Sequence, residues 1–232
     1  LATQHPGMHA KRAAYGATGM VLNFLAIIML PLAEATTLGF TAPIFAVILS
    51  VLLLGERVGR YRWAAVVLGF AGVLLIARPG DGHIPLAGAA ISMGGAFMVA
   101  LISIQIRDMN RTEKPLAIVF WFAAFTTPVA GLFLPFVMTS HSAADWGLLL
   151  MIGLFGGLGQ LLLTAALRFG AVASVVVMDY SALIWATLYG WFLWDQLPTA
   201  ATWVGAPLIV AAGLIIAWRE HRLSRPVQAS AA

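Results

Sequence analysis

The sequence predicts an all-α fold, a polytopic membrane helix bundle, and three observations support this. First, 61% of the 232 residues are hydrophobic and only 9% are charged, with a mean hydropathy of +0.94. No soluble domain of this length could cover so much apolar surface with so few polar side chains. Second, the apolar residues form runs of about 20, the length that crosses a bilayer. Third, residues 25–78 and 165–219 resemble each other, with Ala26 aligned on Ala166 and Trp63 on Trp203.

Eight apolar runs are long enough to cross hydrocarbon, and each predicts one transmembrane helix. They cover residues 13–32, 35–54, 61–77, 86–106, 115–137, 146–167, 172–194 and 201–218. Between them stand turn-forming or charged residues, as expected at helix ends. In chain order these separators are Pro31, Gly55 to Arg57, Arg78 to Gly82, Arg107 to Pro115, Thr139 to Asp145, Arg168 to Gly170 and Asp195 to Thr199.

The basic residues predict the orientation of these helices. If the chain crosses the bilayer at each run, one set of loops holds 12 of the 13 Lys and Arg residues. This set comprises Lys11, Arg12, Arg57, Arg60, Arg62, Arg107, Arg111, Lys114, Arg168, Arg219, Arg222 and Arg225, whereas Arg78 alone lies on the other side. The positive-inside rule therefore places the C-terminus in the cytoplasm. The high pI reflects this topology and gives no reason to expect a nucleic-acid partner.

The two similar segments have opposite orientations, because the loop after Glu56 is cytoplasmic and the loop after Gln196 faces outward. Such an inversion requires an odd number of helices in each repeat. We expect residues 1–80 to hold the last three helices of a first repeat and residues 81–222 to hold a five-helix second repeat. Residues 223–232 would form a cytoplasmic tail. Equal repeats then predict two further helices before Leu1; the alternative is a self-standing eight-helix protein.

The segment from Leu30 to Gly80 contains LPLAEATTLGFTAPIFAVILSVLLLGERV, then Trp63 and GFAGVLLIARPG. It resembles the EamA-type repeat of the drug/metabolite transporter superfamily. The second copy resembles the C-terminal EamA repeat through Gly159-Gln160, Asp179-Tyr180-Ser181 and Trp218-Arg219-Glu220. This resemblance implies a ten-helix carrier of two inverted repeats with a central pocket, of which the chain shows eight helices. Within the superfamily it is most similar to the bacterial branch of S-adenosylmethionine and riboflavin importers.

Asp179 is the main candidate for a functional side chain. It lies about eight positions into an apolar run, where a carboxylate costs roughly 2.5–3.5 kcal/mol on insertion scales. Small residues follow it four apart, at Ala182, Ala186 and Gly190, and indicate a face that packs against other helices. The first copy keeps such a stripe without the acid, at Gly39, Ala42, Ala46 and Ser50. We expect Asp179 to bind substrate or a proton; a hydrogen bond that only joins helices is the alternative.

Further candidates for the pocket are polar or aromatic. Gln160 and Asn23 are the other strongly polar side chains well inside apolar runs, and each would bind substrate or a neighbouring helix. Aromatic candidates are Phe40, Tyr180 and Trp185, for which packing or lipid contact is the alternative. An aromatic-lined pocket with one buried acid favours a cationic, zwitterionic or ring-bearing molecule, such as an amino acid, an S-adenosylmethionine-like compound or a vitamin.

Glu34 stands in the first turn of its helix. There a carboxylate is stabilised by the helix N-terminus, and a role at the outer gate is the alternative.

Several other chemistries have no motif in this sequence. There is no cysteine, no Gly-rich loop ending in Lys-Ser/Thr and no Gly-x-Ser-x-Gly elbow. The five histidines, His5, His9, His83, His141 and His221, fall outside the apolar runs without metal-ligand spacing. We therefore expect no metal, no cofactor and no enzyme activity. Because no Lys or Arg falls within an apolar run, a strongly anionic substrate would lack a counter-charge.

Together these observations predict a secondary transporter of the bacterial inner membrane that moves a small organic metabolite by alternating access. Its partners would be that substrate and the lipid bilayer, with possible coupling to protons or to exchange. A non-transporting truncated paralogue is one alternative. An intramembrane enzyme with Asp179 as its acid or base is another.

Overall fold

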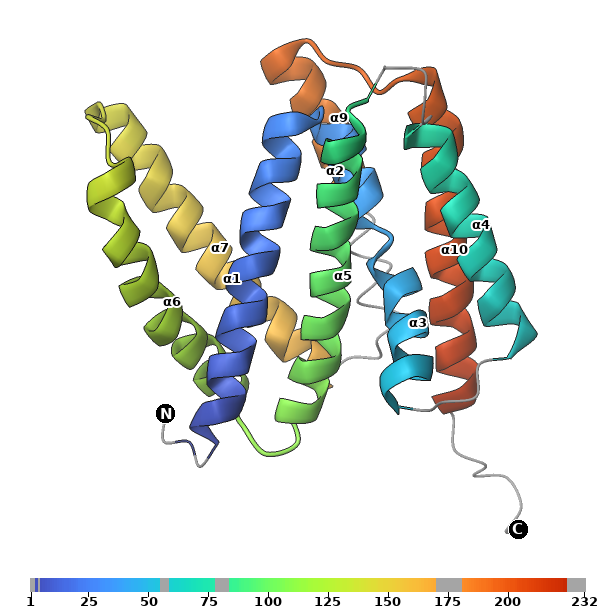
Figure 1. Ribbon diagram of the computed structural model, residues 1–232, viewed down its shortest axis with the longest axis horizontal. Coiled ribbons are helices and arrows are strands. Elements are labelled where there is room, and N and C mark those ends of the chain that lie inside the picture. The colour runs from blue at the N-terminus through green and yellow to red at the C-terminus, as the bar shows by residue number, and fades with distance from the viewer. Residues whose placement is uncertain (1–2, 4, 55–58, 78–83, 170–180, 225–232) are drawn as a thin grey trace. The chain divides into compact units, whose positions relative to one another are not determined.

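The computed structural model describes the chain apart from residues 1–2, 4, 55–58, 78–83, 170–180 and 225–232 (Figure 1). Every regular element in the described part is a helix. In chain order these are α1 (Pro6–Met29), α2 (Leu32–Gly39), α3 (Ala42–Leu54), α4 (Arg60–Ala77), α5 (Leu86–Met109), α6 (Pro115–Val137), α7 (Ala143–Phe169), α9 (Ser181–Trp194) and α10 (Ala200–Ser224).

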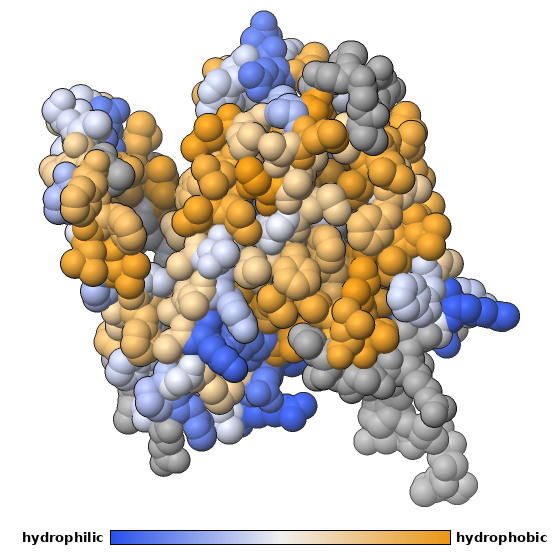
Figure 2. Space-filling view, in the orientation of Figure 1, coloured by the Kyte–Doolittle hydropathy of each residue, from blue (hydrophilic) through white to orange (hydrophobic). Residues whose placement is uncertain are grey.

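Within the described residues, seven helical segments are long and apolar enough to cross a membrane. They are Pro6–Met29, Leu32–Leu49, Arg60–Ala77, Leu86–Met109, Pro115–Phe136, Ala143–Ala166 and Ala200–Arg219. Each overlaps one predicted apolar run. The eighth run, 172–194, lies partly outside the described residues, and α9 is its described part. Apolar residues dominate the surface visible in Figure 2, as lipid contact requires. The chain is a polytopic membrane helix bundle.

The described helices belong to two compact units. The first comprises residues 1–17 and 102–170. It therefore contains the start of α1, the end of α5, and the whole of α6 and α7. The second comprises residues 18–101 and 171–232.

In the first unit, local signals fix the limits of α6 and α7. Pro115 opens α6, a position where its missing N–H costs no hydrogen bond. Ser142 and Asp145 form a reciprocal cap at the start of α7: the Ser142 N–H donates to Asp145 Oδ2 at 2.9 Å, and the Asp145 N–H donates to Ser142 Oγ at 3.2 Å. The observed α6 has the same limits as the predicted run 115–137.

In the second unit, α4 and α10 lie side by side and antiparallel (Figure 1). A Cβ atom added to Gly72 would lie 2.8 Å from the Gly205 carbonyl oxygen, and one added to Gly205 would lie 2.7 Å from that of Gly72. One turn earlier in α4, a Cβ on Gly69 would lie 3.2 Å from Ala212 Cβ, which is further along α10. The two backbones thus meet where neither has a side chain, a contact typical of membrane helices.

The predicted run 35–54 corresponds to one membrane-spanning segment, but its helix is not continuous, because the structure divides it into α2 and α3 at Phe40 and Thr41. Pro43 has no N–H with which to continue the α-helical ladder. Shorter bonds replace the ladder: the Thr41 N–H donates to the Leu38 carbonyl at 3.1 Å, and its Oγ1 donates to the same oxygen at 2.7 Å. The break falls within the membrane-spanning segment Leu32–Leu49.

The expectation that no Lys, Arg or His lies within a membrane-spanning helix was wrong. α1 begins at Pro6 rather than at residue 13, and so it includes His9 and Arg12. Both are buried, with exposed fractions of 0% and 3%. The polar first turns of α1 pack against the connection between α5 and α6, where Glu113 offers a partner to His9. A membrane-spanning helix therefore carries a buried cation, and the argument against anionic substrates no longer holds.

Candidate functional site

Asp179 and Tyr180 lie outside the described residues, so their roles remain predictions. The helix that follows them supports part of the reasoning about Asp179. α9 packs against α2 and buries Ala186 and Gly190, two of the three small residues of the predicted stripe. Ala182 is exposed. In the first copy, α3 instead buries Ile44 and Val47, and the small residues Ala42 and Ala46 are only half-buried.

Phe40 occupies the break between α2 and α3. Its N–H donates to the carbonyl oxygens of Thr36 and Thr37, at 3.2 and 3.1 Å. Its half-buried ring packs against an apolar cluster of the second unit that includes Leu38, Ile76 and Ile209. The aromatic candidate therefore lies where a membrane-spanning helix is interrupted, a feature of many transporter binding sites.

Asn23 lies where α1 and α5 approach closely. A Cβ atom added to Gly95 would lie 2.8 Å from Asn23 Oδ1, so this half-buried amide rests against bare backbone. Phe40 packs on a cluster that contains Ala26, one turn further along α1. Asn23 and Phe40 thus border neighbouring parts of the second unit.

Trp185 and Gln160 have different surroundings from Phe40 and Asn23. Trp185 is 55% exposed and stacks on Tyr189, with ring centroids 6.1 Å apart. Gln160 belongs to the first unit, where its side chain is half-buried. Its main-chain carbonyl accepts a 2.7 Å hydrogen bond from Thr164 Oγ1. Gly153 and Gly157 lie near Gln160 on α7. Apart from their chain neighbours and the backbone of α7, no atom of the described chain lies within 4 Å of the Cβ position of either glycine.

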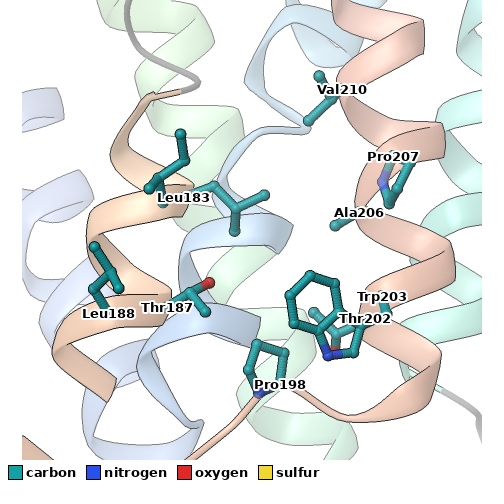
Figure 3. Close-up of a pocket in the computed structure, with 10 residues that line it drawn as sticks. Leu183, Thr187, Leu188, Pro198, Thr202, Trp203, Ala206, Pro207 and Val210 are labelled. Carbon is teal, nitrogen blue, oxygen red and sulfur yellow. The ribbon is translucent and has the colours of Figure 1, made fainter. Parts of the chain in front are cut away.

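A cavity of about 480 Å³ opens between α9 and α10 in the second unit. Figure 3 shows Leu183 and Thr187 of α9 on one side, and Trp203 and Ala206 of α10 on the other. The lining is almost wholly apolar: Leu183, Ile184, Thr187, Leu188, Pro198, Thr202, Trp203, Ala206, Pro207 and Val210. Such a space suits an apolar or ring-bearing group.

Behind this cavity lies Glu34, whose carboxylate is completely buried. Its Oε1 accepts a hydrogen bond from the Thr199 N–H at 3.0 Å and another from Thr202 Oγ1 at 3.1 Å. Thr202 also lines the cavity, so it links the carboxylate to the cavity wall. Glu34 Oε2 has no hydrogen-bond partner among the described residues.

Sequence reasoning gave Glu34 a minor role, at the start of its own helix. The structure confirms that Glu34 lies in the first turn of α2, and it shows that the carboxylate also binds the start of α10. Thr199 and Thr202 form a signal that the sequence does contain. A hydroxyl residue just before a helix, followed three positions later by a second polar residue, is a pattern typical of helix caps. Nothing in the sequence joined that pattern to an acid 165 residues away.

Comparisons with known proteins now define the family. The EamA-like transporter family model matches residues 12–78 and 86–218. The pseudopaline exporter CntI of Pseudomonas aeruginosa is 32% identical over 216 residues, which cover 91% of this chain and 75% of the exporter. A riboflavin transporter of Rhizobium johnstonii is 31% identical over 226 residues, 97% of this chain and 74% of its own. A riboflavin transporter of Vibrio cholerae is 30% identical, with 97% and 76% covered.

The fold is also found in a solved crystal structure. Its TM-score is 0.63 at 23% identity, and the similarity covers 96% of this chain and 79% of that one. The family match spans both halves of the sequence and nearly all of the membrane-spanning helices. The chain is therefore a member of the EamA-like transporter family, which consists of transporters and not enzymes.

Proposed function

We propose that this protein is a secondary transporter of the bacterial inner membrane, which moves a small organic metabolite by alternating access between two inverted repeats. The observation that carries this proposal is the EamA-like match over residues 12–78 and 86–218, in a chain with seven described membrane-spanning segments. Alternating access needs two similar units that can rock around a shared site.

The contact between α4 and α10 supports the inverted arrangement. Trp63 near the start of α4 aligns with Trp203 near the start of α10, so these helices are counterparts in the two copies. They pack antiparallel through Gly72 and Gly205. Inverted repeats require that equivalent helices of the two copies run in opposite directions through the membrane.

The proposed substrate is ring-bearing, cationic or zwitterionic. Two of the relatives are named for riboflavin, which is a flat ring system with a polar tail. The proposed binding residues are Asp179, Tyr180 and Gln160, with Phe40, Asn23 and Trp185. Phe40 at the α2–α3 break and Asn23 against bare Gly95 backbone have the surroundings that such a role needs, since interrupted helices and exposed backbone offer hydrogen bonds inside the bilayer.

A counterflow assay in proteoliposomes tests this proposal. Vesicles preloaded with unlabelled riboflavin should accumulate external radiolabelled riboflavin above the level of protein-free vesicles. Preloading with S-adenosylmethionine, a neutral amino acid or a sugar phosphate then defines the substrate class by the same readout. If the folded protein gives no counterflow with any ring-bearing, cationic or zwitterionic solute, the proposed transport function is wrong.

A further inference from the structure

The first unit contains a buried polar network that the proposed transport site does not use. Thr3 Oγ1 donates a hydrogen bond of 2.6 Å to Glu113 Oε1. His9 Nε2 lies 3.1 Å from Thr3 Oγ1 and 3.6 Å from Glu113 Oε1. His9 is 0% exposed and Glu113 is 8% exposed. The network joins the start of α1 to the connection between α5 and α6.

These contacts indicate where the protons lie. With Glu113 ionised, Thr3 gives its one hydroxyl proton to the Glu113 carboxylate, and the imidazole Nε2–H then donates to Thr3. A neutral His9 then has its free lone pair on Nδ1. This atom is buried and has no hydrogen-bond partner among the described residues. His9 therefore offers a vacant proton acceptor, and the nearby carboxylate can stabilise the imidazolium that forms.

Arg12 is the other buried charge of this unit in the described chain. It lies one turn beyond His9, is 3% exposed, and has its guanidinium 4.5 Å from the centre of the Phe122 ring. With Glu113 ionised, the three side chains have no net charge while His9 is neutral. They carry one positive charge when His9 takes up a proton.

Within the described residues, the other groups in contact with His9 carry no charge, and the titratable His5, whose N–H donates to Thr3 Oγ1 at 3.0 Å, is exposed. Trp121 of α6 has its ring centroid 6.0 Å from the imidazole. From α5, Gln105 Nε2 donates to the Met8 carbonyl at 3.1 Å. The other charged residues at this end of α5 and α6 are exposed, namely Arg107, Asp108, Arg111 and Lys114.

We infer that His9 is a proton-binding site, and that its protonation makes transport depend on pH; the second part rests on the proposed function. Imidazole is the side chain whose charge changes between about pH 5 and 8. A proton taken from water converts the contact with Glu113, which Thr3 bridges by hydrogen bonds, into an ion pair, and it adds a second cation beside Arg12. It therefore changes the forces that hold the start of α1 to the α5–α6 connection. Ionisable groups within membrane helices act as proton relays in other transporters.

Nuclear magnetic resonance of the full chain, with ring-15N-labelled histidine, tests proton binding without any substrate. The His9 signal is identified by its loss in His9→Gln, or by elimination with variants of the other four histidines if His9→Gln does not accumulate. We expect the Nε2–H signal of neutral imidazole to give way to that of imidazolium as the pH is lowered, in spectra recorded between about pH 5 and 8. A His9 signal that stays unchanged over this range would overturn the inference.

Riboflavin counterflow at several pH values tests the consequence for transport. The glutamine side chain of His9→Gln can still donate to Thr3 but cannot take up a proton. Over about pH 5–8 we expect the wild-type rate to change at least about fivefold and the His9→Gln rate less than about twofold. The matched control is His141→Gln, because His141 is exposed; it should keep the wild-type profile.

The two assays separate the two proposals. Wild-type counterflow whose pH dependence survives in His9→Gln would overturn the role of His9 in transport. Absence of wild-type counterflow with riboflavin would count against that substrate. The resonance experiment would still decide whether His9 binds a proton.

Discussion

Glu34 holds the start of α10 with a single carboxylate oxygen. Its two donors, the Thr199 N–H and the Thr202 hydroxyl, belong to the first turn of that helix and its cap. A buried carboxylate in a membrane protein is unfavourable unless it is hydrogen-bonded. Here one side chain satisfies a free N–H of the helix end and also fixes a hydroxyl on the cavity wall, so α2 and α10 depend on each other.

This arrangement predicts different effects for two substitutions of Glu34. Glu34→Gln keeps a carbonyl oxygen for both donors and should change the free energy of unfolding by less than about 1 kcal/mol. Glu34→Ala leaves the Thr199 N–H and the Thr202 hydroxyl without their acceptor and should cost about 1–3 kcal/mol. Denaturation of the purified protein in mixed micelles measures both values. Equal losses would show that the charge, and not the hydrogen bonds, stabilises this contact.

Asp179 gives the second prediction at this scale. Asp179→Asn should abolish or severely weaken transport while membrane expression stays near normal. Removing a charge from an apolar segment does not hinder insertion, but the amide can neither supply a negative charge nor titrate. Riboflavin counterflow and the amount of membrane-inserted protein are the two measurements. Unchanged counterflow would reduce Asp179 to a structural residue, whereas lost expression would mean that its carboxylate holds the bundle together.

Among the elements, those defined by local signals were predictable. The run 115–137 gave the limits of α6, because a proline opens the helix and apolar residues continue to its end. The start of α1 was not predictable in this way, since its first turns contain polar residues that fold only because a distant segment satisfies them. Pro43 indicated an irregularity in the run 35–54. The sequence alone does not distinguish a proline that starts a new helix from a proline that only kinks a continuous one.

The close contact of α4 and α10 predicts that its glycines cannot be enlarged. In Gly72→Ala the new methyl group would lie 2.8 Å from the Gly205 carbonyl oxygen, and the helices would have to separate. We expect a loss of about 1–3 kcal/mol in the free energy of unfolding. Gly157→Ala is the matched control, because none of the described residues that could obstruct a methyl group lies within 4 Å of its Cβ position. Equal stability of both variants in micelles would contradict the proposed contact.

Across the whole molecule, the sequence predicted the membrane class and the family but found few contacts of the candidate site. Composition and run length suffice for the class, because the bilayer imposes one solution on every spanning segment. The contacts of Glu34 and Glu113 join residues 165 and 110 positions apart in the chain. No helical periodicity or short motif contains such a pairing. Asp179 and Tyr180, the leading candidates, remain predictions.

The orientation of the whole chain is the last prediction. Twelve of the 13 basic residues fall on one side of the predicted topology, so that side should face the cytoplasm. Green fluorescent protein fused after Arg225 should fluoresce, because it folds in the cytoplasm, and alkaline phosphatase fused there should be inactive. Alkaline phosphatase inserted after Ser140, in the connection between α6 and α7, should be active, because it requires the oxidising periplasm. The opposite pattern would reverse the loop assignment, and it would place the His9 network on the outer side of the membrane and the Glu34 contact on the inner side.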